Sequence, residues 1–292
     1  MTPDFFDRFA ADPGTGSPPG LQLLFHTALD LDADAVTASL HAHPELAAAR
    51  VELVRVADVP AAASLVSADG PPASVLGLVE WGDHRVRLAG FDAPMPYGPV
   101  EACVGPAMVA PPVKQDAKLH RSHALLYYTG THGDPLERYV ALGVVASALA
   151  RLDAIVVMNE EARTAVPALD LIPEDGEDLL RTLRGLPLPY LYAGFVKLDV
   201  GDAERPWVRT FAAHRFGLPD LAYHLSGHSE TSQAFRLFAG MLGYLRQSGE
   251  RFEPGDGIDL GGEGKLRLRA PTDAEWYLES DGTMLVVEGT SD

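Results

Sequence analysis

The spacing of apolar residues changes repeatedly along the first hundred positions, which predicts a mixture of strands and helices. Short apolar runs, some of them alternating with polar residues, are typical of strands. One segment instead has helical spacing, with acidic residues near its start and Pro44 just past its end. A Gly-Asp pair at 82–83 separates two β-type runs and indicates a hairpin. The predicted strands are 21–29, 51–56, 75–80 and 85–91, and the predicted helix is 32–43.

A strand–helix–strand unit is predicted near residues 124–158. The segment 136–150 is apolar on nearly every side, so we expect a helix that is covered all round. The sequence before it, Asp134-Pro135-Leu136-Glu137, has the form of a capping box with proline at the first helical position. Apolar runs at 124–128 and 155–158 flank the helix. This order predicts a parallel pair of strands joined by a right-handed crossover.

The remaining third of the chain continues the mixture, without an internal repeat or a clear linker. Its most regular feature is a helix at 230–245 with one broad apolar face. The fold class predicted from these patterns is α+β, a mixed sheet with packed helices that includes the crossover near residues 124–158. We expect one composite domain over residues 1–292; the alternative is two subdomains, 1–110 and 111–292. The other predicted elements are a helix near 178–183 and strands at 190–198, 207–212, 265–269, 275–278 and 284–288.

The charge balance changes the picture of possible partners. The 292 residues include 23 basic and 41 acidic side chains, which gives a net charge of −18. Such a surplus opposes binding to nucleic-acid backbones and to anionic lipid, so we expect neither a nucleic-acid partner nor a membrane. It favours solubility, and it also attracts basic proteins, so the expected partner is a basic protein.

Cysteine content and apolar runs indicate the compartment. Cys103 is the single cysteine, which excludes a disulfide within the chain and a cysteine-built metal site. The N-terminal residues 1–11 lack the basic region and apolar run of a signal peptide. The longest apolar stretch, 140–150, is too short to span a bilayer. We therefore expect a soluble, cytoplasmic protein.

Four segments are similar in order and spacing to a known bacterial family. They are Ala93-Pro94-Met95-Pro96; His120-Arg121-Ser122-His123 at the start of a strand; FAAHRFGLPD at 211–220, with its Phe216-Gly217 pair; and FEPGDG at 252–257, after a helix and before a strand. Over about two hundred residues the chain thereby resembles the family called domain of unknown function 4261. The chain has Asp220 and Ala222 at two positions where that family often carries acidic residues. The resemblance implies no established activity.

Histidine pairs are the first candidates for chemistry. His120 and His123 are three residues apart, a spacing that brings two metal ligands together on a helix. His123, however, begins a predicted strand, in which successive side chains point to opposite faces, and no third ligand is close in sequence. We therefore expect these histidines to bond backbone groups, and we expect no metal site and no cofactor.

The best-placed candidate site lies beyond the predicted crossover strands. In open α/β arrangements ligands bind at the carboxyl ends of parallel strands. Loop 129–133 follows the first strand and contains Thr129 and His132, and loop 159–161 follows the second and contains Asn159 and Glu160. Together with His123, these four residues form the candidate ligand or partner site.

Two functional hypotheses follow from the sequence. The first is a non-enzymatic, protein-binding protein of an immunity or regulatory type, favoured by the acidity and by the lack of a recognisable catalytic motif. The alternative is a hydrolase-like enzyme with its site at loops 129–133 and 159–161, where His132 would supply acid–base chemistry. We expect no turnover, because the other motif-like runs lack the spacing that catalytic groups require.

Overall fold

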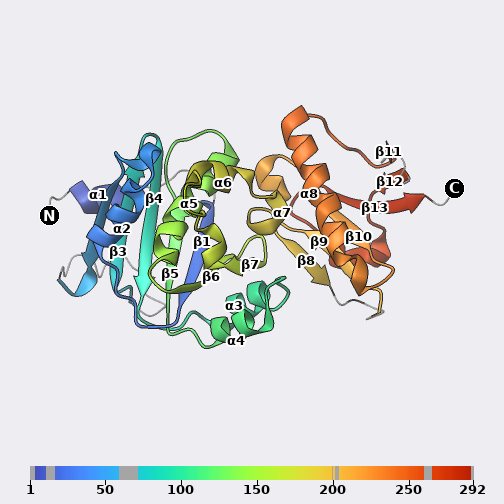
Figure 1. Cartoon of the computed structure of the whole chain (residues 1–292). Coiled ribbons are helices and arrows are strands. Elements are labelled where there is room, and N and C mark those ends of the chain that lie inside the picture. The colour runs from blue at the N-terminus through green and yellow to red at the C-terminus, as the bar shows by residue number, and fades with distance from the viewer. Residues whose placement is uncertain are drawn as a thin grey trace. The chain divides into compact units, whose positions relative to one another are not determined.

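The computed structural model describes residues 4–10, 17–58, 72–198, 200, 204–259 and 265–290. They form two compact units, and the fold is α+β as predicted (Figure 1). Unit 1 comprises residues 1–160 and 165–185, and unit 2 comprises residues 161–164 and 186–292. A boundary near residue 110 would separate strands β4 (His84–Phe91) and β5 (Ser122–Tyr128), which are hydrogen-bonded neighbours. That the two units act as one composite domain stays a prediction.

Unit 1 is built on a seven-stranded sheet, sheet A, whose strand order is β2-β3-β4-β5-β1-β6-β7. The predicted hairpin is confirmed, because β3 and β4 pair antiparallel with Trp81 opposite His84. The remaining strands of sheet A are β1 (Gly20–Phe25), β2 (Arg50–Arg55), β3 (Val75–Trp81), β6 (Ala154–Asn159) and β7 (Thr164–Pro167).

The predicted crossover exists, but its two strands are not neighbours. Strand β1 lies between β5 and β6 and runs antiparallel to both, so β5 and β6 point the same way without pairing. The predicted parallel pair is therefore wrong in this respect. The physical reason is the apolar character of β1: Leu21, Leu23 and Leu24 are buried, which suits a central strand covered on both faces. A strand so far away in sequence gives no local signal of where it will insert.

Helices cover both faces of sheet A. Helix α5 contacts β1, β4, β5 and β6 on one face and is covered in turn by α2, α6 and residues 168–171. Its predicted start is confirmed, since the Asp134 carboxylate accepts a 2.9 Å hydrogen bond from the N–H of Leu136. Helices α1, α3 and α4 pack against apolar side chains of the other face, among them Leu24 and Leu76. The helices are α1 (Asp4–Ala10), α2 (Ala33–His41), α3 (Tyr97–Val104), α4 (Pro111–Lys118), α5 (Pro135–Ala150) and α6 (Leu179–Gly185).

Unit 2 is built on a six-stranded sheet, sheet B, in the order β11-β12-β13-β10-β9-β8. Within it β10 and β13 are parallel, and the other pairs are antiparallel. Helix α8 lies across one face (Figure 1), where Phe235 and Phe238 pack edge-on against Phe195. The elements of unit 2 are α7 (Leu188–Leu191), α8 (Thr231–Ser248), β8 (Phe195–Leu198), β9 (Trp207–Thr210), β10 (Asp220–His224), β11 (Gly257–Asp259), β12 (Lys265–Arg269) and β13 (Met284–Thr290).

Two predicted strands of unit 2 are wrong in part or whole. The segment 275–278 belongs to a 3-10 helix, Asp273–Leu278, because Thr272 and Glu275 form a capping box that turns the chain. The segment 190–198 is a strand only from Phe195 onward, since α7 and the left-handed Gly194 (φ 46°) precede it. Across the described ranges, none of the helices has both the length and the apolar character needed to cross a membrane.

Candidate functional site

The His-x-x-His motif fastens a loop to sheet A. His123 is buried, its ring stacks on Phe91 at 4.7 Å, and its Nδ1–H donates to the carbonyl of Ala93 at 2.7 Å. His120, which follows α4, donates from Nδ1 to the carbonyl of Ala117 in that helix, and its Nε2 accepts a 2.7 Å hydrogen bond from the N–H of Met95. Burial lowers the pKa of both histidines, so the neutral rings hold this loop in place.

The loop after β5 is held by its own hydrogen bonds. The N–H of Thr129 donates to the carbonyl of Arg85 at 2.8 Å. His132 accepts a 3.2 Å bond at Nδ1 from the N–H of Asp134, and its ring stacks on His84 at 5.1 Å. The Thr129 hydroxyl is buried and has no hydrogen-bond partner among the described residues. Thr129 and His132 thus share one loop, as predicted.

The loop after β6 holds the other two candidates. Asn159 is buried at the end of that strand, and its carbonyl lies 3.8 Å from the Cys103 sulfur. The N–H of Glu160 donates to the side-chain oxygen of Gln22 at 3.2 Å. Because β1 separates β5 from β6, the two strand ends are about 10 Å apart. The structure places Thr129, His132, Asn159 and Glu160 in two separate loops beyond the same end of sheet A, whereas His123 lies at the opposite end of β5. The role of these residues stays a prediction.

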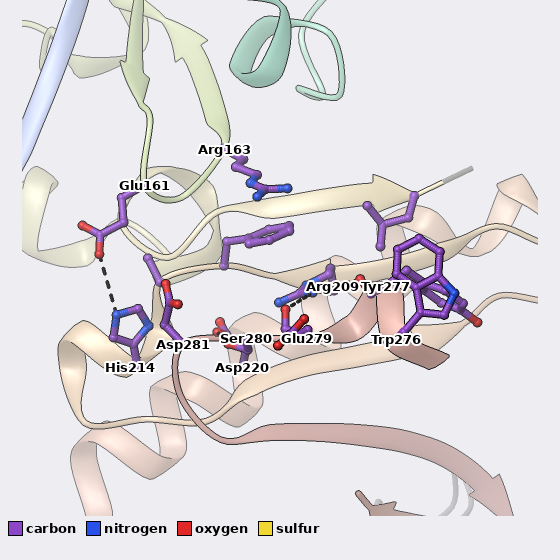
Figure 2. A pocket seen from close by; sticks show the side chains of 13 residues that line it. Glu161, Arg163, Arg209, His214, Asp220, Trp276, Tyr277, Glu279, Ser280 and Asp281 are labelled. Atoms are coloured by element: carbon purple, nitrogen blue, oxygen red, sulfur yellow. Dashed lines mark hydrogen bonds and ion pairs between the residues drawn. The ribbon is translucent and has the colours of Figure 1, made fainter. Parts of the chain in front are cut away.

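A more complete constellation lies in unit 2, on the face of sheet B opposite α8. It is a polar pocket of about 440 Å³, a size typical of ligand sites. Figure 2 shows Glu161 and Arg163 approaching from one side, with His214, Asp220 and the 276–281 segment on the other. Its lining residues are Glu161, Arg163, Leu198, Arg209, Phe211, Ala212, His214, Asp220, Trp276, Tyr277, Glu279, Ser280 and Asp281.

The alternation of strand β9 places Arg209 in this pocket. Trp207, two residues earlier, packs with Leu278 and Ala222 beneath the 3-10 helix, so Arg209 shares that face. Its Nη1 donates to the carbonyls of Tyr277 (3.2 Å) and Glu279 (2.9 Å), and its Nε donates to that of Thr210. These bonds fasten the 277–279 segment over the sheet.

Arg209 is a buried cation with an unused donor. Its side chain is 1% exposed, and Nη2 has no hydrogen-bond partner in the described part of the chain. Burial lowers the pKa of Arg209 to about 10, an effect that nearby Asp220 and Asp281 partly offset. It therefore remains charged at neutral pH. A buried N–H without an acceptor costs about 1–3 kcal/mol, and such a group needs an explanation.

The guanidiniums of Arg209 and Arg163 both lie over the aromatic ring of Phe211. Arg209 lies 3.9 Å from the ring centre of Phe211, and Arg163 lies 4.5 Å from it. Arg163 has a left-handed backbone (φ 51°), and so has Ala212 (φ 66°), which also lines the pocket. This conformation is unfavourable for residues with a Cβ, and such strain gathers at functional sites.

The carboxylate of Asp220 organises the pocket floor. It is buried and accepts bonds from the Thr210 hydroxyl (3.0 Å), the N–H of Ala213 (3.1 Å) and the Ser280 hydroxyl (2.5 Å). Three donors therefore satisfy its charge. Asp220 joins strands β9 and β10 to the 280–281 turn.

The wall contributed by residues 161–164 is fixed by an ion pair. The Glu161 carboxylate bonds to the guanidinium of Arg215, and His214 Nε2 lies 3.7 Å from the same carboxylate. His214 Nδ1 is buried and lacks a partner among the described residues. Behind this wall, Gly194 leaves room for the carbonyl of Ala162. The described residues contain no group of three or more His, Cys, Asp or Glu side chains placed to hold a metal ion.

Sequence reasoning found part of this pocket and missed its centre. The 211–220 segment, chosen for its resemblance, supplies Phe211, His214 and Asp220, and Glu161 belongs to a loop chosen for its position. Arg209 was missed because a basic residue in a short strand looks like an ordinary exposed position. The left-handed Arg163 gives no sequence signal either.

Comparison with family models, curated proteins and solved structures gives no significant match for this chain. The pocket geometry therefore carries the functional argument.

Proposed function

We propose that this protein acts by binding rather than by turnover, as a regulatory or immunity-type protein, and that the unit 2 pocket is its binding site. The observation that carries the proposal is Arg209, which lines the pocket and whose buried Nη2 has no hydrogen-bond partner among the described residues. An acceptor from a bound molecule would satisfy this donor. The left-handed residues Arg163 and Ala212 support the same location.

The hydrogen bonds of the pocket support binding over catalysis. Hydrolysis by a serine needs a base that accepts the hydroxyl proton. The Ser280 hydroxyl donates to the Asp220 carboxylate, which also accepts bonds from Thr210 and Ala213, so this bond belongs to the set that holds the pocket floor together. The hydrolase alternative at loops 129–133 and 159–161 has less support, because β1 separates the strands that precede the two loops and Nδ1 of His132 already accepts a bond from Asp134.

The kind of partner follows from charge and from the rim of the pocket. With a net charge of −18, the chain attracts basic proteins over a distance of about a Debye length, roughly 8 Å in physiological salt. Trp276, 75% exposed, stands at the rim beside Tyr277. Exposed tryptophan, tyrosine and arginine are the residue types that dominate protein interfaces. A basic protein is therefore the partner we propose.

Membership of the family called domain of unknown function 4261 is part of the same proposal. Its support is the 211–220 segment, which carries the resemblance and also forms a wall of the pocket. A cytoplasmic location fits the single buried Cys103.

Capture of partners from a lysate of the native host by matched baits tests the proposal. The baits are the wild type, the double variant Arg163→Ala/Trp276→Ala, and the control Arg236→Ala/Tyr244→Ala. The control removes an arginine and a half-exposed tyrosine from α8, on the opposite face of sheet B. Thermal melts confirm that all three are folded.

We expect one protein, more basic than average, to be recovered by the wild type and the control. Its recovery should fall about tenfold with the pocket variant, the loss expected for about 1.4 kcal/mol of binding free energy. Its association should slow as salt is raised. Identical recovery by all three baits would contradict the proposed site. Turnover in a hydrolase screen that disappears in His132→Ala would contradict the proposed function.

A further inference from the structure

We infer that residues 129–134, the loop between β5 and α5, form a proton-sensitive latch. The latch is closed on the β3–β4 hairpin while the imidazoles of His84 and His132 are neutral, and it opens when this pair is protonated. All of these residues belong to unit 1, so the inference is independent of the unit 2 pocket.

Three backbone N–H groups close the latch. That of Thr131 donates to the carbonyl of Asp83, in the turn of the hairpin, at 3.0 Å. That of His132 donates to the hydroxyl of Tyr128, the last residue of β5, at 3.2 Å. That of Asp134 donates to Nδ1 of the His132 ring, also at 3.2 Å. Opening of the loop would expose all three N–H groups to water together.

The bond from Asp134 requires a neutral imidazole on His132. Because Nδ1 is the acceptor, the ring in the closed loop is the tautomer that carries its proton on Nε2. Protonation places a hydrogen on Nδ1, which then faces the N–H of Asp134 and accepts nothing. The ring must turn away, and the loop loses one of the three bonds that close it.

The ring of His84 adds a second contact that depends on protons. It stacks on Trp81 and on His132, with 5.1 Å between ring centres in both cases, and the two imidazoles are within 15° of parallel. Burial lowers the pKa of His84, and a charge on His132 lowers it further. Two protonated rings at this distance repel each other across the contact between the loop and the hairpin.

Charged side chains around the pair act in both directions. They are Asp83, Asp134, Glu137, Arg138 and Arg184. The carboxylates favour a protonated ring, and the guanidiniums oppose it. Neither imidazole forms an ion pair with a carboxylate in the described part of unit 1. No single neighbour there fixes the charge of the rings, and pH decides it in the range where histidine titrates.

Amide hydrogen exchange of the full-length protein, followed by NMR at pH 7.5 and pH 5.0, tests the inference. Protection factors are compared, since they remove the effect of pH on the intrinsic exchange rate. The N–H groups of Thr131, His132 and Asp134 should lose about tenfold in protection at the lower pH, which corresponds to about 1.4 kcal/mol. The paired N–H groups of β4 and β5 should keep theirs.

The variant His132→Asn separates protonation from contact. An asparagine oxygen accepts from the N–H two residues further on, as in an Asx turn, but takes up no proton in this range. The protection of the Asp134 amide should therefore be the same at both pH values. His26→Asn is the control, since it makes the same substitution at an exposed histidine of unit 1 and should keep the wild-type response.

The variant Gly130→Ala should hold the latch open at both pH values. The added Cβ would lie 2.5 Å from the Asp83 carbonyl oxygen and 2.6 Å from the Tyr128 hydroxyl, so the loop cannot close. The three amides should be about tenfold less protected than in the wild type at pH 7.5, and acid should change them little. Gly133→Ala is the matched control, because nothing lies within 4 Å of its added Cβ.

Unchanged protection of the three amides in the wild type overturns the inference. An equal loss throughout β4 and β5 also overturns it, because acid would then unfold the unit instead of opening one loop. The wild-type response in His132→Asn has the same consequence. If that variant does not fold, Gly130→Ala decides the question: protection as in the wild type, or the wild-type response to acid, contradicts the latch.

Discussion

The imidazole of His120 accepts a 2.7 Å hydrogen bond from the backbone N–H of Met95. These residues belong to two segments that carry the resemblance to domain of unknown function 4261, 93–96 and 120–123, which are therefore one structural device. The bond from His123 to the carbonyl of Ala93 completes it. The role of both histidines is to hold the chain after β4 against α4 and β5.

The first prediction is that this device is sensitive to acid. Burial lowers the pKa of His120 and of His123 from 6.5, so the unfolded chain binds protons more readily than the folded one. Their contribution to stability is thus fully present above pH 6.5 and is lost as the pH falls below that value. Urea denaturation of the wild type should show a lower free energy of unfolding at pH 5.5 than at pH 7.5.

The variant His120→Ala provides the contrast. At pH 7.5 it should be less stable than the wild type by about 1–3 kcal/mol, because the N–H of Met95 loses its acceptor in a buried place. It should lose less stability than the wild type on acidification, although His43 and His84, whose pKa values burial also lowers, still contribute. The same pH dependence in both proteins would contradict the assignment.

The second prediction concerns the core of unit 1. Val144 of α5 is fully buried, with sheet A on one side and α2 and α6 on the other. Val144→Asp should lower the free energy of unfolding by about 3–5 kcal/mol, because it buries an unpaired charge. The control is Leu169→Asp, which adds the same charge at an exposed apolar residue of the same unit and should change stability by less than about 0.5 kcal/mol. Thermal melts that gave both variants the same midpoint would contradict this placement of the core.

Local signals explain which parts of the fold could be predicted. The start of α5 follows from Asp134 and Pro135, whose capping chemistry acts within one turn of helix. The β3–β4 hairpin follows from Gly82, which supplies the positive φ of 50° that the turn requires. The place of β1 between β5 and β6 could not be predicted, because it depends on pairing between residues more than ninety positions apart.

The third prediction concerns the wall that carries Arg163 into the pocket. A Cβ on Gly194 would lie 1.9 Å from the carbonyl oxygen of Ala162, and the backbone there has φ 46°. Gly194→Ala should therefore cost about 3 kcal/mol or more in unfolding free energy and should displace residues 161–164. Gly176→Ala is the control, since its φ is 87° but nothing lies within 4 Å of the added Cβ. It should cost about 1–2 kcal/mol, the backbone term alone.

Chemical denaturation of both glycine variants measures the difference. If Gly194→Ala lowers the free energy of unfolding no more than Gly176→Ala does, residues 161–164 can move aside at little energetic cost. In that case Arg163 would not be held in the pocket.

From the sequence, only those pocket residues that lie close together along the chain could have been grouped into a site. Asp220 and His214 lie within one short segment, so their proximity was predictable. Ser280 bonds to Asp220 across sixty positions, and Arg209 bonds to the 277–279 carbonyls across about seventy. Because a strand was expected at 275–278, the 3-10 helix that brings these carbonyls over the sheet was not predicted.

The last prediction concerns the segment that forms the pocket rim. Glu275 accepts two bonds from Arg269, at 2.7 and 2.6 Å, and also accepts the N–H of Thr272, which begins the 3-10 helix. The Arg269 guanidinium holds the pKa of Glu275 at about 2. The contribution to stability is thus present above pH 4.5 and is lost as the pH falls towards 2. Glu275→Gln should be about 1–3 kcal/mol less stable than the wild type at pH 7.

That difference should shrink as the pH falls from 4.5 towards 2, because a protonated glutamate and a glutamine then differ little. Glu288→Gln is the matched control: Glu288 bonds to the same guanidinium at 2.6 Å but is 48% exposed, so its loss should cost no more than about 1 kcal/mol. Denaturant titrations at a series of pH values give both quantities. If Glu275→Gln and Glu288→Gln were equally stable at pH 7, the capping of the 3-10 helix would not depend on Glu275. In that case the core beneath the rim, in which Leu278 packs against Trp207, would hold the rim in place. It would position both Trp276 and the Tyr277 carbonyl that accepts a bond from Arg209.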